Sequence, residues 1–357
     1  MKKKILISTG GTGGHVVPAK IFFEHLINDF EVFISSDERG VKFLNLEKEK
    51  VKIINTPKIK NNLFLLPYNF FLIIFLTIKS FFFIRKNNID ILISTGGYMS
   101  LPICISAKIL NLKIYLYEPN MVIGRANIFF MGLCKKIFCY SDKIQNFPKR
   151  YLDKIIVINP LLRKSFYSIK FDDKKILDEV KLLIIGGSQG AKFFDQVINE
   201  VILNLSKKYK LKIYQQSSRE NYENLENFYN SNNIVYKLFD YSESISEFMS
   251  DSNLCITRAG ASTLSELTFL NVPYLAIPYP FAKDNHQHEN ALFYKNKNCC
   301  WLLEQKSIKN NEIFDLIMHI ISDHQDVESK INQMQKISYQ NTWNNINKKL
   351  LDIINEN

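Results

Sequence analysis

Short apolar runs, glycine-rich turns and amphipathic stretches recur in the same order along the whole chain. The first run, Lys4–Ser8, is followed by the glycine-rich residues 10–14 and by a predicted helix from Val17 to Ile27. The same order returns at Asp90–Ser94 and at Val180–Ile185. Apolar strands that alternate with helices are typical of parallel sheets covered on both faces. The pattern predicts an α/β fold with two doubly wound, Rossmann-like domains.

Further strands are predicted between these landmarks. In the first half they lie at Glu31–Ser35, Val51–Asn55, Lys113–Tyr117, Lys136–Tyr140 and Lys154–Ile158, which gives a sheet of about seven strands. In the second half they lie at Leu211–Gln215, Ile234–Lys237, Leu254–Ile256, Tyr274–Ile277 and Cys300–Leu303. Glycine turns at corresponding places in both halves predict that the two domains face a central cleft.

Breaks in the pattern set the expected domain boundaries. Residues 1–163 form the N-terminal domain, the charge-rich residues 164–179 a linker, and residues 180–337 the C-terminal domain. The remaining segment, 338–357, keeps apolar residues at helical spacing. We expect it to form a C-terminal helix that packs back on the N-terminal domain.

The most apolar stretch of the chain is Leu63–Lys86. It contains the run Phe70–Ile84 of 15 residues, which is broken by Thr77, Lys79 and Ser80. As a helix this run would be about 22 Å long, shorter than the roughly 30 Å hydrocarbon core of a bilayer. Three interpretations are open. The stretch spans a membrane, or is a buried core helix, or packs one face on the sheet and rests the other on an anionic membrane surface.

Charge and cysteines narrow the class of protein. The 357 residues carry a formal net charge of +11, which favours anionic partners such as phosphorylated substrates or an anionic membrane surface. Helix-turn-helix, zinc-finger and RNA-binding signatures are absent, so no nucleic-acid partner is expected. The six cysteines form no CxxC pair, and Cys104 and Cys255 lie in apolar runs, which predicts buried thiols in a reduced, cytosolic chain. The start, MKKKILISTGG, is interpreted as a strand and not as a signal peptide.

Polar side chains follow several predicted strands, at the ends where open α/β sheets bind ligands. His15 ends the first glycine turn, where an imidazole ring can act as a base or as a hydrogen-bond donor to a phosphate. Asn120 follows the strand 113–117, and Glu266 lies in the second turn of a helix. Acceptors for hydroxyls beside backbone donors for phosphates favour a sugar nucleotide as the ligand. Packing of His15 and capping by Asn120 are the structural alternatives.

Six motifs, in the same order, resemble the MurG family of UDP-N-acetylglucosamine–N-acetylmuramyl-(pentapeptide) pyrophosphoryl-undecaprenol N-acetylglucosamine transferases. They are GGTGGHVVPA, STGGYMSLP, YEPNMVIGRAN, GGSQGA, TRAGASTLSE and KDNHQHENA. The resemblance implies a GT-B fold, with the donor UDP-GlcNAc held mainly by the C-terminal domain and the lipid acceptor by the N-terminal domain. It implies an inverting transfer of GlcNAc to undecaprenyl-pyrophosphoryl-MurNAc-pentapeptide (lipid I) to form lipid II in peptidoglycan synthesis. It further implies no cofactor, no metal site, and a peripheral location at the cytoplasmic face of the inner membrane.

The resemblance also implies roles for individual residues. His15 is the candidate catalytic base. The substrate-binding residues are Thr12, Gly13, Gly14, Asn120, Arg163, Ser188, Gln189, Ser242, Glu266, His286 and Gln287. Among them, Gly13 and Gly14 belong to the loop near the acceptor diphosphate, Ser188 and Gln189 to the donor-diphosphate loop, and Glu266 to the nucleotide ribose. His286 and Gln287 contact the transferred sugar, and the uracil lies against backbone near Ser242. The family has a G-N-P-x-R run where this chain has NPLLR, so Arg163 aligns only after a shift of the proline.

Besides the two substrates, the expected partners are an anionic membrane surface and proteins of cell-wall synthesis and division. Two other interpretations stay open. One is a different GT-B enzyme, such as a glycolipid glycosyltransferase or a UDP-GlcNAc 2-epimerase. The other is a non-catalytic membrane scaffold, for which the polar residues His15, Asn120, Ser188, Glu266 and Gln287 would have no use.

Overall fold

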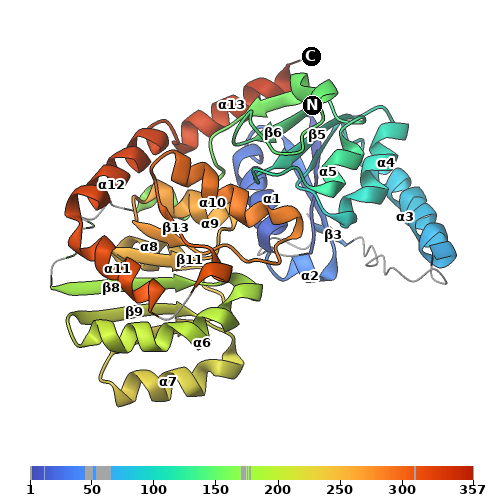
Figure 1. Ribbon diagram of the computed structural model, residues 1–357. Coiled ribbons are helices and arrows are strands. Elements are labelled where there is room, and N and C mark those ends of the chain that lie inside the picture. Colours follow the sequence, from blue (N-terminus) through green and yellow to red (C-terminus); the bar gives the residue numbers. More distant parts are fainter. Residues whose placement is uncertain are drawn as a thin grey trace. The chain divides into compact units, whose positions relative to one another are not determined.

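The computed structural model describes residues 2–11, 13–44, 51–53, 66–169, 174, 176, 178–308 and 311–356. The chain forms two compact units (Figure 1). Unit 1 contains Met1–Arg163 together with Trp343–Asn357, and unit 2 contains Lys164–Thr342. Each unit is built on one parallel sheet, so the predicted pair of Rossmann-like domains is confirmed.

Unit 1 contains a seven-stranded parallel sheet with the order β3-β2-β1-β4-β5-β6-β7. Its strands are β1 (Lys4–Ser8), β2 (Glu31–Ser36), β3 (Val51–Ile53), β4 (Ile91–Ser94), β5 (Lys113–Glu118), β6 (Lys136–Cys139) and β7 (Ile155–Val157). Its helices are α1 (Gly13–Leu26), α2 (Glu38–Val41), α3 (Leu66–Lys86), α4 (Leu101–Ile109), α5 (Arg125–Phe130) and α13 (Trp343–Asn355).

Unit 2 contains a six-stranded parallel sheet with the order β10-β9-β8-β11-β12-β13. Its strands are β8 (Glu179–Ile185), β9 (Lys210–Gln216), β10 (Val235–Phe239), β11 (Leu254–Thr257), β12 (Tyr274–Ala276) and β13 (Trp301–Leu302). Its helices are α6 (Gly187–Ser206), α7 (Tyr222–Ser231), α8 (Ile245–Asp251), α9 (Ala261–Phe269), α10 (His286–Asn296), α11 (Glu312–Ser322) and α12 (His324–Ser338).

The two sheets have the same strand order, except that unit 1 has β7 as an additional edge strand, and this order positions the candidate sites. In unit 1 the chain runs outward from β1 to β3 and then returns to place β4 on the other side of β1. In unit 2 it runs from β8 to β10 and then places β11 beside β8. Ligands of doubly wound sheets bind at this reversal, outside the carboxyl ends of the strands. The turns after β1 and β4, and those after β8 and β11, are therefore neighbours.

Two helices begin earlier than the sequence pattern predicts. Helix α1 begins at Gly13 and not at Val17, and α6 begins at Gly187, inside the predicted glycine turn. The positive-φ residues at these turns are Gly11, before α1, with a φ of 84°, and Gly187, the first residue of α6, with a φ of 62°. As a result His15 lies in the first turn of a helix and not in a loop.

The core of each unit follows from the apolar strands. The side chains of Ile5, Leu6 and Ile7 in β1 are all buried, as expected for a strand covered on both faces. Cys104 and Cys255 are buried thiols, as predicted, and all six cysteines are free. Burial raises the pKa of the Cys104 thiol to about 12.

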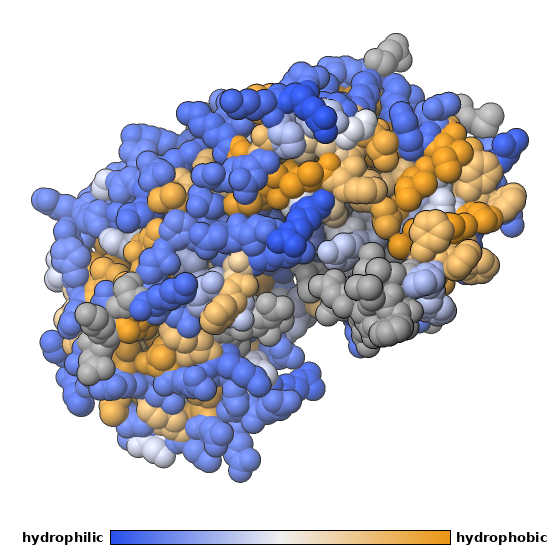
Figure 2. Space-filling view, turned by 45° about the vertical axis from the view of Figure 1, so that its right-hand side comes forward, coloured by the Kyte–Doolittle hydropathy of each residue, from blue (hydrophilic) through white to orange (hydrophobic). Residues whose placement is uncertain are grey.

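Helix α3 packs one side on unit 1 and exposes the opposite side. Leu76, Ser80 and Ile84, spaced by four residues, are buried, and Ser106 of α4 donates a hydrogen bond to the carbonyl of Thr77 at 2.7 Å. The opposite side carries Phe71, which is 68% exposed. Figure 2 shows apolar residues gathered on this part of the surface. A fully buried core helix is thus excluded.

Helix α13, from the C-terminal part of the chain, packs on unit 1. Its first residue, Trp343, stacks on His25 of α1 with ring centroids 3.7 Å apart. Near its other end, the hydroxyl of Tyr115 in β5 donates to the carbonyl of Ile353 at 3.2 Å. The last helix therefore contacts both a helix and a strand of the first half of the sequence (Figure 1).

Candidate active site

The unit 1 site forms where the turns after β1 and β4 meet. The hydroxyls of Thr9 and Thr95, at the ends of these strands, are 2.9 Å apart. Met99, just after the second turn, packs on Gly10, where a Cβ atom would lie only 2.7 Å from its Cγ. Only glycine fits at position 10, because the two turns approach so closely.

His15 lies between the two turns. Its Nδ1 atom is 2.8 Å from the carbonyl oxygen of Thr95. Because a carbonyl only accepts hydrogen bonds, the neutral ring must carry its proton on Nδ1. The Nε2 atom is then left with a lone pair that can accept a proton. Gly96 lies against the ring, where a Cβ atom would be 3.4 Å from Cε1 and the φ of 93° disfavours any other residue.

A buried carboxylate also supports the first turn. Asp37, directly after β2, accepts the N–H of Gly11 at 2.8 Å, the N–H of Gly40 at 2.9 Å and Nε–H of Arg39 at 2.7 Å. Burial alone would raise the pKa of Asp37, but these donors lower it below its ordinary value. Asp37 is therefore ionised at neutral pH.

The loop after β5 is organised by Glu118. This carboxylate is buried and accepts from Nδ2 of Asn120 at 2.9 Å, from the N–H of Gly124 at 2.7 Å and from Nδ2 of Asn127 at 2.9 Å. The side-chain NH2 group of Asn120 therefore already donates to Glu118. Glu118 is thus the acceptor that holds the loop, and the role of Asn120 in substrate binding stays a prediction.

The unit 2 site begins at the amino terminus of α6. Gly187 donates its N–H to Oε1 of Gln216, at the end of β9, at 2.8 Å. The N–H groups that follow in the first turn have no partner within the helix and carry its positive dipole end. Ser188 and Gln189 lie in this turn, and the structure describes their backbone. Thr12, in the other unit, lies outside the described residues.

Arg258, after β11, is a buried cation that the sequence analysis did not select. Its Nη1 donates to the carbonyls of Ile277 at 2.9 Å and Pro278 at 3.1 Å. The guanidinium also stacks on Phe193 of α6, 4.6 Å from the ring centroid. Burial lowers its pKa to about 10. Arg258 thus ties the amino-terminal part of α6 to the loop that follows β12.

That loop presents His286 and Gln287. Asp284 and Asn285 both have a left-handed backbone, with φ of 54° and 57°, an arrangement that costs free energy in non-glycine residues. The Nδ1 atom of His286 is 2.7 Å from the carbonyl of Lys283, and Oε1 of Gln287 accepts the N–H of Tyr279 at 2.9 Å. These contacts fix both side chains at the start of α10.

Three other predicted residues lie at separate places. Glu266 is buried in α9, in its second turn as predicted. The hydroxyl of Ser242, after β10, accepts the N–H of Ser244 at 3.1 Å, ahead of α8. Arg163 is half-buried and is the last residue of the first segment of unit 1. The structure thus brings Gly13, Gly14 and His15 to one strand-end site and Glu266, His286 and Gln287 to elements around another.

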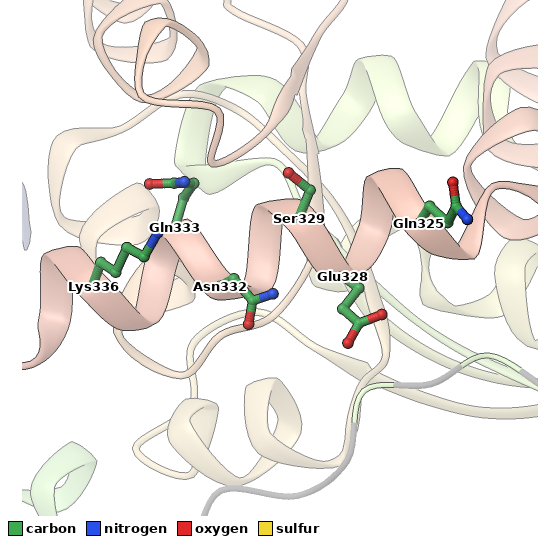
Figure 3. Close-up of a pocket in the computed structure, with 6 residues that line it drawn as sticks. All are labelled: Gln325, Glu328, Ser329, Asn332, Gln333 and Lys336. Atoms are coloured by element: carbon green, nitrogen blue, oxygen red, sulfur yellow. The ribbon is translucent and has the colours of Figure 1, made fainter.

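A surface hollow elsewhere does not compete with these sites. It is lined by Gln325, Glu328, Ser329, Asn332, Gln333 and Lys336 (Figure 3). All six belong to α12, so no strand end or glycine turn contributes to it. Among the described residues, no group of three or more histidine, cysteine or acidic side chains could hold a metal ion.

Asp37 and Arg258 carried a weak signal in the sequence. Each directly follows an apolar strand, in SSDERG and in TRAGAS, as the predicted site residues do. Their partners could not be found in this way, because the N–H of Gly11 and the carbonyl of Ile277 come from other strand ends. Burial, the property that marks both residues, depends on the packed fold.

Both halves of the chain match models of one protein family. Residues 5–139 match the glycosyltransferase family 28 N-terminal domain, and residues 181–350 match its C-terminal domain. A UDP-N-acetylglucosamine–N-acetylmuramyl-(pentapeptide) pyrophosphoryl-undecaprenol N-acetylglucosamine transferase of Pelagibacter ubique is 53% identical over 357 residues, with both chains covered completely. The enzyme of the same name from Rickettsia felis is 32% identical over 345 residues, covering 94% of this chain and 95% of that one.

Solved structures show the same fold. MurG of Acinetobacter baumannii superimposes with a TM-score of 0.76 at 21% identity, covering 99% of this chain and 100% of that chain. A UDP-N-acetylglucosamine 2-epimerase gives a TM-score of 0.61 at 11% identity, covering 93% and 91%. The GT-B architecture of glycosyltransferases is therefore established. With both family 28 domains present and 53% identity over its full length to one of these transferases, the chain belongs to the MurG family.

Proposed function

We propose that the protein transfers N-acetylglucosamine from UDP-GlcNAc to undecaprenyl-pyrophosphoryl-MurNAc-pentapeptide, which forms lipid II for peptidoglycan synthesis. The observation that carries the proposal is the 53% identity over the full chain to a transferase with this reaction in its name. The two strand-end sites add support, because they offer the polar groups that a sugar nucleotide and a phosphorylated acceptor require.

The proposed reaction is a single inverting displacement. The acceptor hydroxyl oxygen bonds to the anomeric carbon while the bond from that carbon to the β-phosphate oxygen breaks. Nε2 of His15 takes the hydroxyl proton, since Nδ1 is already held by Thr95. UDP leaves with the electron pair. The first turn of α6, which contains Ser188 and Gln189, faces the developing negative charge with its unpaired N–H groups.

The other site residues bind the substrates in this proposal. Glu266 holds the ribose, the backbone near Ser242 holds the uracil, and His286 and Gln287 hold the transferred sugar. Arg163 contacts the donor. Thr12, Gly13, Gly14 and Asn120 belong to the substrate-binding set of unit 1.

The direct experiment is a transfer assay with UDP-GlcNAc and a short-chain lipid-linked muramyl pentapeptide. We expect transfer of GlcNAc to the acceptor with inversion. An epimerase would convert UDP-GlcNAc without any acceptor, so the same mixture without acceptor serves as the control. A protein that shows neither reaction and does not bind UDP-GlcNAc in calorimetry would be a scaffold, and the proposal would fall.

We also propose that unit 1 rests on the cytoplasmic face of the inner membrane through α3. Within the described residues one helix, Pro67–Lys86, is long and apolar enough to cross a membrane, and 22% of its most apolar 18-residue window is buried. Because Leu76, Ser80 and Ile84 pack on the protein, a spanning helix would have to give up these contacts. An in-plane helix keeps them and places its exposed aromatic face in the lipid.

The exposed face has the composition that such a position requires. Large apolar side chains more than half exposed are Tyr68, Phe70, Phe71, Phe75, Ile78 and Phe82. Lys79, Arg85 and Lys86 are exposed on the same helix and can reach anionic head groups. An apolar surface of this kind marks an interaction site in a soluble protein. Association with proteins of cell-wall synthesis and division remains a prediction from the family.

A further inference from the structure

Asp37 and Arg39 form a pair at the first glycine turn that the proposed reaction does not yet use. Asp37 is 1% exposed, whereas the side chain of Arg39 is 56% exposed. Nε of Arg39 lies 2.7 Å from Oδ2 of Asp37. The carboxylate thus lies beneath the turn and the guanidinium at its surface.

The position of Arg39 is fixed relative to the turn. A Cβ atom on Gly11 would lie 3.9 Å from its Nη2, so the guanidinium stands next to a residue without a side chain. Nη2 is also 4.0 Å from Sδ of Met99, which is a weak contact. The Nε bond holds the long side chain in one orientation, while the N–H groups of Nη1 and Nη2 have no oxygen acceptor among the described residues.

A cation at this turn adds hydrogen-bond donors for an anion. A glycine turn usually offers its own N–H groups to phosphate. Here the N–H of Gly11 donates to Asp37 and is not available. A guanidinium replaces it with several donors whose planar arrangement matches phosphate oxygens. Preorganisation by Asp37 lowers the entropy cost of binding.

We propose that Asp37 is a positioning residue that shapes the first glycine turn and presents Arg39, and that Arg39 binds the diphosphate of the lipid-linked acceptor. This inference rests on the proposed function and adds two residues to its acceptor site. An acceptor diphosphate that approaches over Gly11 reaches the Nη atoms of Arg39 with its oxygens. The same turn leads into the helix that carries His15.

The test measures KM separately for UDP-GlcNAc and for a short-chain lipid-linked muramyl pentapeptide in detergent without vesicles. Arg39→Gln should raise KM for the acceptor about 10- to 100-fold, the usual effect of losing hydrogen bonds to a charged group, and leave KM for UDP-GlcNAc within about two-fold. Arg39→Lys keeps the charge but not the Nε bond, so its effect should be intermediate. Asp37→Asn should act in the same direction as Arg39→Gln.

A matched control lies at the opposite end of the same sheet. Asp90, before β4, accepts the N–H of Lys4 at 2.8 Å, so it also binds backbone but far from the turn. Asp90→Asn should change neither KM. A purely structural role for Asp37 would lower kcat and the melting temperature and leave both KM values unchanged.

Several outcomes would overturn the inference. These are an acceptor KM within about two-fold of the wild-type value in Arg39→Gln, or an equal rise of both KM values. If Arg39→Gln instead weakens binding to vesicles of anionic phospholipid and leaves the acceptor KM unchanged, the phosphate ligand is a head group and the inference is wrong. Should Asp37→Asn fail to fold, the two Arg39 variants decide. A wild-type protein without transfer activity would refute the proposed function itself, which is a distinct result.

Discussion

The ring of His15 is held by the backbone of Thr95, through a 2.8 Å contact between Nδ1 and a carbonyl oxygen across 80 positions of sequence. The two residues meet because β1 and β4 are neighbours in the sheet. The contact settles which nitrogen carries the proton in the neutral ring, and it directs the basic nitrogen, Nε2, away from the protein backbone.

Replacement of His15 by alanine should lower kcat by about 10²- to 10⁴-fold, the usual contribution of a positioned base. KM for UDP-GlcNAc should stay near its wild-type value, since His15 accepts a proton from the other substrate. Steady-state kinetics with both substrates measure this. Nearly full turnover in His15→Ala would remove the residue from the role of base.

His286 provides the matched control, because its Nδ1 also lies near a carbonyl, that of Lys283, at 2.7 Å. If His286 contacts the transferred sugar, His286→Ala should raise KM for UDP-GlcNAc and affect kcat less than His15→Ala does. The same effect from both variants would argue against separate roles for the two rings.

The stack of His25 on Trp343 predicts a loss of stability in mild acid. Burial lowers the pKa of His25 to about 4, and Asn347 offsets only part of this effect. Because the folded pKa lies below the unfolded value, the unfolded chain binds the proton first. The contribution of neutral His25 to the free energy of unfolding is therefore fully present above about pH 6.5. It falls between pH 6.5 and 4, by roughly 3 kcal/mol in total.

The measurement is the melting temperature from pH 4 to pH 7.5 for the wild type and for His25→Phe. The phenyl ring can keep the stack but cannot be protonated, so its stability curve should be flatter in this range. Equal slopes for the two proteins would show that His25 does not control the acid response.

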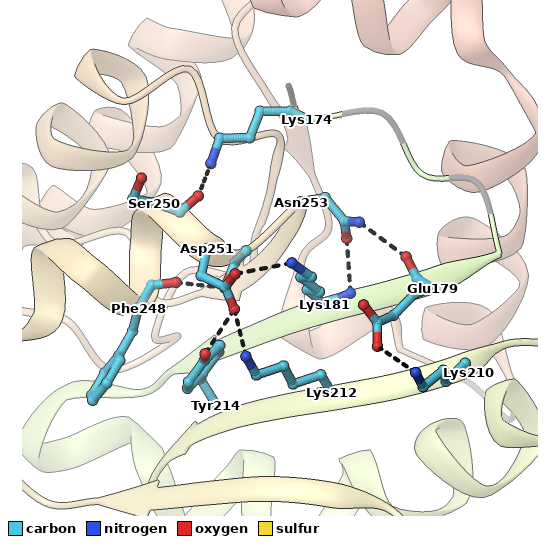
Figure 4. Close-up of polar contacts among 11 residues, drawn as sticks. Lys174, Glu179, Lys181, Lys210, Lys212, Tyr214, Phe248, Ser250, Asp251 and Asn253 are labelled. Atoms are coloured by element: carbon cyan, nitrogen blue, oxygen red, sulfur yellow. Dashed lines mark hydrogen bonds and ion pairs between the residues drawn. The ribbon is translucent and has the colours of Figure 1, made fainter. Parts of the chain in front are cut away.

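Asp251 should stabilise unit 2 at neutral pH. It accepts from Lys181 and Lys212, both at 2.9 Å, and from the hydroxyl of Tyr214 at 2.7 Å (Figure 4). Burial alone would raise the pKa of Asp251, but these three donors lower it well below its ordinary value. Because the folded pKa is depressed, the stabilisation is present above about pH 4 and is lost as the pH falls further.

Asp251→Asn should therefore destabilise the protein at pH 7, by about 1 kcal/mol given the partial exposure of the network. The difference should narrow at pH 3 and in high salt, as measured by urea denaturation. The pair of Lys210 and Glu179 is the control, since its atoms are 3.6 Å apart and the side chain of Lys210 is 75% exposed. Lys210→Gln should have almost no effect, and an equal effect would contradict the prediction.

Asparagine replaces glycine at several helix ends of this chain. Asn111 follows α4 with a φ of 56° and is exposed. Alanine there would have to adopt the left-handed conformation, so Asn111→Ala should destabilise by about 1 kcal/mol, whereas Asn111→Gly should be nearly neutral.

Asn332 gives the opposite case, because it is exposed within α12 and has no positive φ (Figure 3). Asn332→Ala should stabilise by about 0.5 kcal/mol through helix propensity. Chemical denaturation of the three variants measures both effects, the expected loss of stability in Asn111→Ala and the expected gain in Asn332→Ala. Destabilisation by alanine at both positions would show that backbone conformation is not the cause.

Membrane binding should depend on the aromatic face of α3. Phe71 is 68% exposed and Phe75 is 60% exposed. Since each phenyl ring gains about 1.5–3 kcal/mol on leaving water, the double variant Phe71→Ser, Phe75→Ser should bind anionic vesicles at least about 10-fold more weakly. Substitution of Tyr339, which lies between α12 and α13 and is 83% exposed, is the control and should leave vesicle binding unchanged. Unchanged vesicle sedimentation in the double variant would exclude α3 as the contact.

Much of the fold could be predicted from the sequence because its signals are local. Runs such as 5–7 are apolar at every position, and a glycine follows each of the strands β1, β4 and β8 within three residues. Both features act over a few residues, so they specify a strand and a turn wherever the chain is placed. The motifs around His15 and Glu266 indicated the family for the same reason.

Helix boundaries and hydrogen-bond partners could not be predicted in this way. Helix α1 begins at Gly13 because Gly11 has already turned the chain, and that conformation depends on Asp37 at the end of another strand. The length of α3 shows the same limit. The apolar run suggested 15 residues, but the helix contains 21, since packing on α4 does not require every residue to be apolar.

The sequence by itself determined the α/β class, the repeated strand, turn and helix, and the residue types available for chemistry. The tertiary structure decided which of these residues meet. His15 reaches Thr95, Asp37 reaches Gly11, and Trp343 reaches His25 only after distant strands and helices have packed. The physical reason is that periodicity reports which side chains leave water, whereas strand order and helix packing decide which donor faces which acceptor.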